Sequence, residues 1–233
     1  MKTENANLGI VVAAGGSKRM GPGVDKAFLT LGTMPVLAYS LLAFEKCPDI
    51  DGVILVVRKD RQDAARGMAQ IYGCSKVLKV AMGGATRQVS VSRGLAEIGE
   101  EARIVAVHDG ARPCIKPDLI SETVKSAKRY GSGVAAVKVT DTVKRVERGL
   151  TVSKTVDRAK LWVVQTPQTF RADLLKKAMA AVQHKRVTVT DEASAVELLG
   201  EPVRLVPAAL SNIKVTTPDD LALAAGLLRL MER

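Results

Sequence analysis

The chain has 233 residues, a formal net charge of +11 at pH 7 and only 3% aromatic residues. This length fits one α/β domain, or one domain with an appended arm, and the scarcity of aromatic residues argues against base-stacking platforms for nucleic acid. The charge is compatible with small phosphates, nucleic acid or an anionic membrane surface. Because several cations adjoin glycines, prolines or carboxylates at predicted strand ends, rather than one tail or helix face, we favour small phosphates.

Cysteine usage and hydropathy indicate the compartment. Cys47, Cys74 and Cys114 are odd in number and lack paired metal-ligand spacing, so we expect reduced thiols. Residues 1–7 are polar, without an apolar core of signal-peptide length, and no later apolar run is long enough to span a bilayer. We therefore expect a cytoplasmic protein that has neither a membrane nor a nucleic acid as its partner.

The first apolar run, at residues 8–12, predicts a buried strand that leads into a loop of small residues at 13–17. Small side chains let an anionic ligand approach main-chain N–H groups, while Arg19 and Lys26 supply positive charge. The Gly-Lys-Ser/Thr ending of a Walker loop is missing, as are the three spaced glycines of a dinucleotide fingerprint. The loop is therefore interpreted as a polyphosphate cradle, with an ordinary strand-to-helix turn as the alternative.

Strand and helix patterns alternate along the rest of the chain. Further strands are predicted at residues 54–57, 77–80, 104–107, 134–139, 161–164 and 203–206. Helices are predicted at residues 34–44, 60–72, 87–98, 117–130 and 171–183. A further helix is predicted to start over residues 190–193, with Thr190 as its cap, and the last helix begins at residue 218. A polar turn is expected at residues 165–168. This alternation predicts an α/β fold with a doubly wound, mostly parallel sheet.

Two polar loops follow predicted strands. Gly84 precedes Arg87 and Ser90 in a first helical turn, which suits a polar ligand, although a capped helix start has the same pattern. Asp109 follows another strand and suits a ribose hydroxyl or a divalent cation, and Arg112 suits a phosphate. A structural ion pair between these two residues is the alternative.

His108 precedes Asp109, and we expect it to be a hydrogen-bonded structural histidine rather than a catalyst. Residues 141–158 change to short, polar, β-prone segments around a glycine, which predicts a hairpin arm that interrupts the sheet. Such an arm buries little surface within its own subunit, so exchange with a partner chain would stabilise it. We expect residues 1–233 to form one domain with this arm inserted.

Five segments in register resemble the 2-C-methyl-D-erythritol 4-phosphate cytidylyltransferase family over nearly the whole chain. They are AAGGSKRM at 13–20 with Lys26, HDGARP at 108–113, TVDR at 155–158, TDEAS at 190–194 and NIKVT at 212–216. One motif would mean little, whereas five in the same order are specific. The chain departs from the commonest family pattern at Val12, Ser17 and Ala85.

The resemblance implies a Rossmann-like nucleotidyltransferase fold and a homodimeric enzyme of non-mevalonate isoprenoid biosynthesis. This enzyme transfers CMP from CTP to 2-C-methyl-D-erythritol 4-phosphate, with magnesium, and releases pyrophosphate. The catalytic residues would be Arg19, Lys26, Arg158 and Lys214. The CTP-binding residues would be Ala13, Ala14, Gly15, Gly16, Ser17, Gly84, Arg87, Ser90, Asp109 and Gly110. The residues that bind the second substrate would be Arg112, Thr142, Arg158, Thr166, Thr190 and Lys214.

The resemblance also implies that the arm carries Thr142 and Arg158 into the partner's site. It leaves the metal ligands open, with Asp109 as a candidate. The chemistry agrees, because the attacking group is already a phosphate anion and needs no general base, only cations that offset repulsion between two anions.

Three alternatives remain. A cytidylyltransferase for another polyol phosphate, such as ribitol 5-phosphate, shares the loop and the CTP site, although residues 110–112 and 156–158 favour methylerythritol phosphate. A nicotinamide- or flavin-binding oxidoreductase is disfavoured by the missing fingerprint and by Arg58 and Lys59 after the second strand. A non-catalytic, basic nucleic-acid-binding protein is supported by the charge alone.

Overall fold

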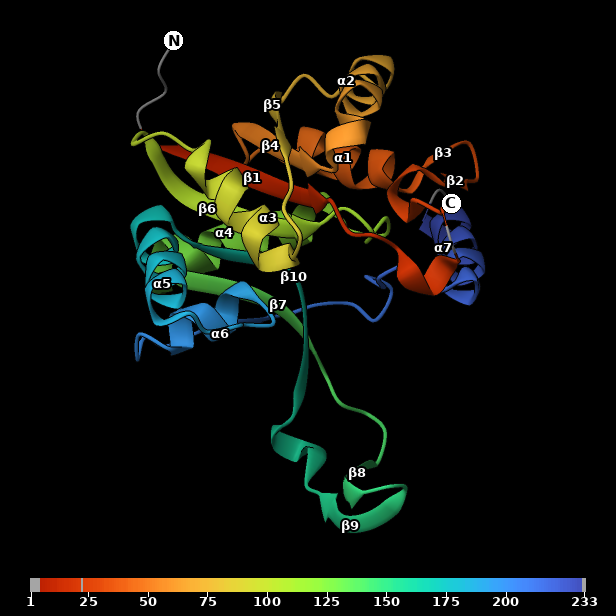
Figure 1. Ribbon diagram of the computed structural model, residues 1–233, viewed down its shortest axis with the longest axis vertical. Helices are drawn as coiled ribbons and strands as arrows, with labels where there is room; N and C mark the ends of the chain where they lie inside the picture. Colours follow the sequence, from red (N-terminus) through yellow and green to blue (C-terminus); the bar gives the residue numbers. More distant parts are fainter. Residues whose placement is uncertain (1–4, 22, 232–233) are drawn as a thin grey trace.

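A seven-stranded sheet forms the centre of the computed structural model, which describes residues 5–21 and 23–231 (Figure 1). The strands are β1 (Ala6–Ala13), β4 (Gly52–Val57), β5 (Val77–Met82), β6 (Ala102–Asp109), β7 (Ser132–Lys138), β10 (Trp162–Arg171) and β11 (Leu205–Pro207). Their order is β11-β7-β10-β6-β1-β4-β5. Only β10 runs antiparallel to its neighbours among these strands, so the predicted mostly parallel, doubly wound sheet is confirmed.

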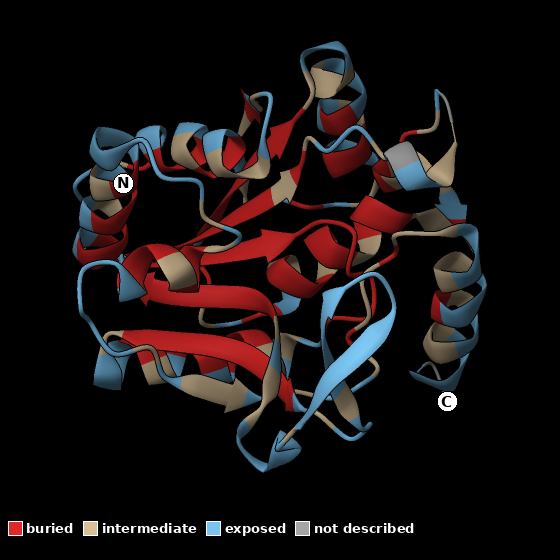
Figure 2. Ribbon diagram, turned by 60° about the horizontal axis from the view of Figure 1, so that its bottom comes forward, coloured by how far each residue is buried: buried red, intermediate tan, exposed pale blue. Residues whose placement is uncertain are grey.

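Helices cover both faces of the sheet, because successive side chains of a strand point to opposite sides. Val11 and Leu55 face a core shared with α1, α2 and α4, whereas Ile10 and Ile54 face a core shared with α3, α5 and α6. The helices are α1 (Val36–Lys46), α2 (Gln62–Ile71), α3 (Arg87–Ala96), α4 (Pro117–Tyr130), α5 (Ala172–Lys185), α6 (Glu192–Glu197) and α7 (Pro218–Met231). Figure 2 shows the sheet buried between these layers.

Short elements surround the main ones. They are η1 (Lys18–Met20), η2 (Lys26–Phe28), β2 (Thr30–Leu31), β3 (Met34–Pro35), η3 (Lys59–Arg61) and η4 (Arg158–Lys160). The helix predicted from residue 34 is wrong at its start, because Pro35 has extended dihedrals and the helix begins at Val36. Pro22, in the glycine-rich segment after the first loop, and residues 1–4 of the polar start lie outside the described residues.

The predicted polar turn at residues 165–168 is also wrong, because these residues lie inside β10. Pro167 has no N–H to donate to a neighbouring strand. The pairing of β10 with β7 shifts register between Val164 and Gln168. The regular pairing of the two strands is therefore interrupted around the proline and resumes at Gln168. A polar segment that looks like a turn in the sequence is therefore a buried part of the sheet.

The predicted arm is a hairpin of β8 (Val143–Arg148) and β9 (Thr151–Val156) that projects from the body (Figure 1). Gly149 turns the chain with a φ of 56°, a left-handed conformation that glycine adopts easily. The arm is exposed except at Val143 and Val156, which are half-buried at its base (Figure 2), and Leu150 at its tip is 97% exposed. Its apolar side chains therefore have few partners within this chain.

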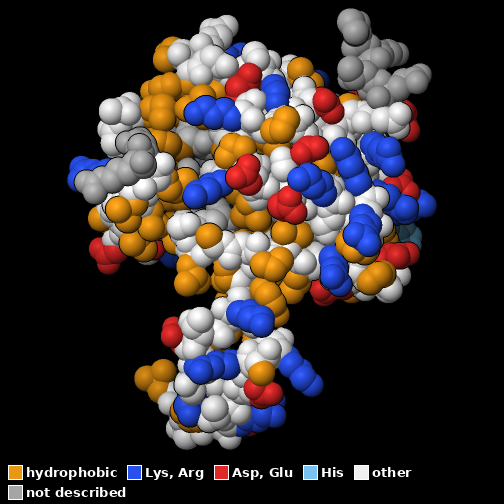
Figure 3. Space-filling model, turned by 180° about the vertical axis from the view of Figure 1, so that it is seen from behind, with side chains coloured by type: hydrophobic (Ala, Val, Ile, Leu, Met, Phe, Trp, Pro, Cys, Tyr) orange, Lys and Arg blue, Asp and Glu red, His pale blue; other side chains and the backbone are white. Residues whose placement is uncertain are grey.

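Basic side chains do not gather into one stripe on the face shown in Figure 3, where they lie on both body and arm among acidic and apolar groups. The three cysteines are buried and free, as expected. Within residues 5–21 and 23–231, every helix is too short or too polar to cross a bilayer.

Candidate active site

A cleft opens at the carboxyl ends of β1 and β6, where the strand order reverses and open α/β sheets bind their ligands. Its volume is about 200 Å³. The predicted site residues that line it are Ala13, Ala14, Gly15, Gly16, Lys26, Gly84, Arg87, Ser90, Asp109 and Lys214. Residues from the first loop, the second loop and the C-terminal segment thus meet at one edge of the sheet, as the sequence predicts.

The first loop carries Lys26 into the cleft through contacts of the loop's own polar side chains. Ser17 has a φ of 50°, and its Oγ accepts a hydrogen bond from the Lys26 N–H at 3.1 Å. Asp25 begins η2 by accepting from the Ala27 N–H at 3.3 Å. Ser17 does not line the cleft itself, and its position indicates that it shapes the loop.

The second loop approaches the first one closely. The Gly83 N–H donates to the Val57 carbonyl at 2.7 Å, and a Cβ on Gly83 would lie 2.2 Å from the Ala14 Cβ. The Ser90 Oγ accepts from the Gly84 N–H at 3.0 Å, which fixes the loop on the first turn of α3. Glycine fits at position 83 because a side chain there would collide with Ala14 of the first loop.

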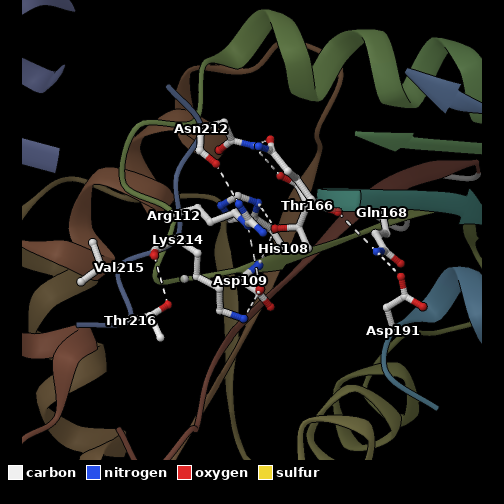
Figure 4. A network of polar contacts seen from close by, with 12 residues as sticks. His108, Asp109, Arg112, Thr166, Gln168, Asp191, Asn212, Lys214, Val215 and Thr216 are labelled. Atoms are coloured by element: carbon white, nitrogen blue, oxygen red, sulfur yellow. Dashed lines mark hydrogen bonds and ion pairs between the residues drawn. The ribbon is translucent and has the colours of Figure 1, made fainter. Parts of the chain in front are cut away.

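Asp109 is the centre of a charged network, shown in part in Figure 4. Lys214 Nζ lies 2.6 Å from Asp109 Oδ2, and Arg87 Nε lies 2.8 Å from Asp109 Oδ1. Burial raises the pKa of the Asp109 carboxyl, but the charges of Arg87 and Lys214 outweigh this effect and hold the pKa well below its usual value. Asp109 is therefore a carboxylate at neutral pH.

Lys26 lies beside this network. Its Nζ donates to the Val215 carbonyl at 2.8 Å, which anchors the ammonium on the C-terminal segment. Burial, followed by the charge of Lys214, lowers the pKa of Lys26, and the charge of Arg19 adds to this effect. Arg19 itself is exposed and does not line the cleft. Lys26, Lys214 and Arg19 together give this region a positive charge that attracts phosphates, although Lys214 is also paired with Asp109.

His108 and Thr166 lie next to Asp109 (Figure 4). The Thr166 hydroxyl accepts from the Asp109 N–H at 3.0 Å, and its Oγ1 also lies within hydrogen-bond distance of His108 Nδ1, at 3.0 Å. Burial lowers the pKa of His108 to about 3, so the ring is neutral at physiological pH. His108 has the structural role predicted for it, and Thr166 contacts the protein interior rather than the surface of the cleft.

Arg112 is buried as well and does not line the cleft. Its Nη1 donates to the Asn212 carbonyl at 2.7 Å, and its Nε lies 3.9 Å from Asp109 Oδ2. Arg112 therefore braces the C-terminal segment against the Asp109 turn, as the structural alternative expects, and its contact with the second substrate stays a prediction. Gly110 is similarly beneath the cleft, where a Cβ would lie 2.7 Å from Leu37 Cδ1.

Some predicted residues lie apart from the cleft. Thr142 and Arg158 are exposed at the base of the arm, and the Arg158 guanidinium contacts the Thr140 carbonyl. Thr190 is exposed just before α6. The predicted capping role of Thr190 is wrong, because Asp191 Oδ1 accepts from the Ser194 N–H at 2.9 Å and caps this helix instead.

Sequence reasoning also missed two carboxylates at the site. Asp25 lines the cleft and is paired with Arg61 at 3.3 Å. Glu192 is buried against Arg87, although in the sequence it resembles an ordinary acidic residue at a helix start. Nothing in the local pattern distinguishes either of them, because both depend on partners far away in the chain.

A metal ion would find few protein ligands here. Within the described part of the chain there is no group of three or more His, Cys, Asp and Glu side chains suited to a metal. Asp109 and Asp25 are the carboxylates that line the cleft. This set fits a cation that takes one or two carboxylates and obtains its other ligands from substrate phosphates, as Mg²⁺ commonly does.

A model of the 2-C-methyl-D-erythritol 4-phosphate cytidylyltransferase family matches residues 8–230. The chain belongs to this family. A cytidylyltransferase of that name from Alkaliphilus metalliredigens is 42% identical over 220 residues, which cover 94% of this chain and 91% of the relative. One from Dehalococcoides mccartyi is 46% identical over 220 residues, which cover 94% of this chain and 95% of the relative.

Solved structures of this cytidylyltransferase family agree with the fold. The 4-diphosphocytidyl-2C-methyl-D-erythritol synthase of Anaerococcus prevotii has a TM-score of 0.85 at 29% identity, over 97% of this chain and 99% of its own. The cytidylyltransferase of Thermus thermophilus has a TM-score of 0.78 at 33% identity, over 94% of this chain and 98% of its own. The resemblance found in the sequence is thereby confirmed.

Proposed function

We propose that this chain transfers CMP from CTP to 2-C-methyl-D-erythritol 4-phosphate in the cleft beside Asp109. The observation that carries this assignment is the convergence of Lys26 and Lys214 with the small-residue loop 13–17 at the reversal point of the sheet. Family membership supplies the two substrates. The product is the cytidine diphosphate adduct, an intermediate of the non-mevalonate route to isoprenoids.

In the proposed reaction, a phosphate oxygen of the methylerythritol phosphate attacks the α-phosphorus of CTP. A new P–O bond forms, the bond between the α-phosphorus and its bridging oxygen breaks, and pyrophosphate leaves with that electron pair. The nucleophile is already an anion, so the protein has to align two anions and offset their repulsion. Lys26, Arg19 and Lys214 supply the charge for this role.

The nucleotide is proposed to lie along the two glycine-containing loops. Main-chain groups of the first loop and of Gly84 would contact the cytidine, and the Ser90 hydroxyl would hold Gly84 in place. Asp109 would contact the ribose. Ala85 lines the cleft where the family often has an acidic residue, so main-chain groups would make the contacts at that position. These roles agree with the lining of the cleft.

Mg²⁺ is proposed to bind chiefly through the phosphates of CTP, with Asp109 as the protein carboxylate best placed to contact it. When bound, it would neutralise part of the phosphate charge. Both Asp109 oxygens already have cationic partners, so phosphates would have to provide most of the coordination. Removal of Mg²⁺ by a chelator is expected to abolish turnover.

We further propose a homodimer in which the arm of one chain brings Thr142 and Arg158 to the cleft of the other. Exposed apolar residues on the arm, with Leu150 97% exposed, support this arrangement. The residues 1–233 would then act as one cytidylyltransferase domain with the 141–158 arm for dimerisation. A cytoplasmic location is proposed on the three free, buried cysteines.

The function is tested by pyrophosphate release from CTP, with either methylerythritol phosphate or ribitol 5-phosphate as acceptor, in Mg²⁺ and in excess chelator. We expect release with methylerythritol phosphate that depends on Mg²⁺. Release with ribitol 5-phosphate alone would move the assignment to the other polyol phosphate. No release with either acceptor from a folded protein would overturn the enzyme assignment.

A further inference from the structure

Glu192 is a buried carboxylate that the proposed reaction leaves without a role. It lies at the first position of α6 and is only 2% exposed. Its Oε1 and Oε2 accept from Arg87 Nη1 and Nη2 at 2.6 and 3.0 Å, which is a two-point contact between planar groups. Arg87 lines the cleft and Glu192 does not, so Glu192 reaches the cleft only through Arg87.

Each of the three nitrogen atoms of the Arg87 guanidinium thereby donates to a carboxylate. Nη1 and Nη2 contact Glu192, and Nε contacts Asp109 at 2.8 Å. Three contacts in one plane leave the group a single orientation. Since a guanidinium with a free edge would turn toward a polyphosphate in an open cleft, the two carboxylates keep Arg87 at its place in the wall.

Two further contacts hold Glu192 in position. Gln168, buried in β10, donates from Nε2 to Asp191 Oδ2 at 2.9 Å, and its Oε1 accepts from the Ala193 N–H at 2.9 Å. These bonds hold the chain on both sides of Glu192 (Figure 4 shows the one to Asp191). Gln88, next to Arg87, accepts from the Val189 N–H at 3.1 Å. The start of α3 and the segment before α6 are therefore joined at two places.

Charge alone does not explain Glu192. A second carboxylate near a cleft that receives polyphosphate weakens the attraction to that ligand. Burial raises the pKa of the Glu192 carboxyl and Arg87 offsets only part of this effect, so the charge of Glu192 depends on its partner. The Glu192 carboxylate weakens the attraction of the cleft for an anionic ligand, and its burial is costly. Its presence is best explained by the geometry that it imposes on Arg87.

We propose that Glu192 is a positioning residue that fixes Arg87, and through Arg87 the Asp109 carboxylate, in the geometry that receives CTP. The inference rests on the proposed function, because it concerns the nucleotide part of that site. Arg87 and Asp109 are assigned to the nucleotide rather than to the reacting oxygens. Loss of Glu192 therefore raises the KM for CTP more than it lowers kcat, since the lost contact serves ground state and transition state alike.

The test replaces Glu192 with Gln, which keeps the shape but offers Arg87 one acceptor instead of two. We expect Glu192→Gln to raise the KM for CTP by about tenfold, with kcat within about twofold of the parent. In an Arg87→Gln background, Glu192→Gln should add no further rise, because it acts through Arg87. An unchanged KM for CTP, or an additional rise in that background, would overturn the proposal.

The matched control is Glu197→Gln, the same chemical change at an exposed residue of the same helix. It is expected to leave the KM for CTP unchanged. The same rise in KM in this control would assign the effect to α6 as a whole rather than to the contact with Arg87. If Glu192→Gln fails to fold, Glu192→Asp is used, which keeps the charge but withdraws the carboxylate by one methylene.

Calorimetric titration of Mg²⁺·CTP without acceptor separates the two levels of inference. If the parent protein does not bind CTP, the proposed function fails. If the parent binds CTP and the folded Glu192 variant binds it equally well, the proposed function stands and the positioning role fails. Weaker binding by the Glu192 variant, with parent-like binding by Glu197→Gln and no further loss when Glu192→Gln is added to Arg87→Gln, supports the positioning role.

Discussion

Lys26 shows at the residue scale how one side chain depends on groups that are distant in the sequence. Its main chain is held by Ser17 and its ammonium by the Val215 carbonyl, which is 189 positions away. Neither contact belongs to the hydrophobic core. The residue therefore contributes charge to the cleft, and little of the fold depends on it.

We predict that Lys26→Ala lowers kcat at least about a hundredfold, because a group that offsets phosphate charge is removed. The unfolding free energy should fall by only about 1 kcal/mol, as expected for one lost hydrogen bond. Pyrophosphate release and urea unfolding measure the two effects. Lys125→Ala, which removes an exposed lysine of α4, is the control and should leave both unchanged; an unfolded Lys26→Ala would indicate a structural lysine.

His108 makes stability depend on pH. The unfolded chain protonates histidine near pH 6.5, whereas burial lowers the pKa of His108 to about 3 in the folded protein. The unfolded state therefore binds more protons between these values, and stability is complete above about pH 6.5 and is lost as pH falls below it. The loss from this group approaches about 1.4 kcal/mol per pH unit.

Urea unfolding between about pH 6.5 and pH 5 measures this slope before most carboxylates titrate. His108→Asn keeps an acceptor for Thr166 and should flatten the slope. His184→Asn, which removes the exposed second histidine, should retain the slope of the parent. A His108→Asn protein whose stability declines as steeply as that of the parent would show that other groups cause the pH dependence.

The positions of strand ends predicted much of the cleft, whereas side-chain roles that depend on distant partners left no local signal. Gly84 and Asp109 lie at or just after strand ends and Ser90 lies in the first turn of the next helix, so the strand ends were enough to bring them together. Arg112 resembles a phosphate ligand in the sequence, but its partner Asn212 is 100 positions away. Glu192 likewise resembles an ordinary acidic residue at a helix start in the sequence, because its partner Arg87 is 105 positions away.

At the scale of elements, the loops after β1 and β5 touch without space between them. We predict that Gly83→Ala raises the KM for CTP about tenfold or more, because a Cβ there would lie 2.2 Å from the Ala14 Cβ and would displace the first loop. Steady-state kinetics against CTP measures the effect. Gly67→Ala in α2, where a Cβ meets open space, is the control, and a normal KM in Gly83→Ala would show that the loops separate without cost.

Elements with a clear period were predicted well, and β10 was not. The α4 helix begins with a proline and ends before Gly131 in a left-handed conformation, so both of its ends were visible in the sequence. The second half of β10 is polar and contains Pro167, features typical of loops. It is a strand because β6 and β7 border it on both sides, and tertiary pairing of this kind leaves no local signal.

At the scale of the whole molecule, the proposed exchange of arms predicts that each site needs two chains. Mixed Lys26→Ala and Arg158→Ala chains should recover about a quarter of parent activity if subunits pair at random, because half of the dimers are mixed and each has one intact site. Each variant alone should be inactive. Differently tagged chains establish that exchange has occurred, and no recovery after exchange would contradict a shared site.

The arm leaves the sheet after β7 and returns in β10, and these strands pair beside each other, with the Val139 N–H donating to the Leu161 carbonyl at 3.1 Å where the arm begins. Departure and return thus occur one strand spacing apart, about 4.8 Å. The part of the hairpin between Thr142 and Arg158 can therefore be replaced by another segment whose ends close to that gap, provided that these two residues are kept. The surface that recognises a partner chain can change in this way without a change in the residues proposed to contact the phosphates.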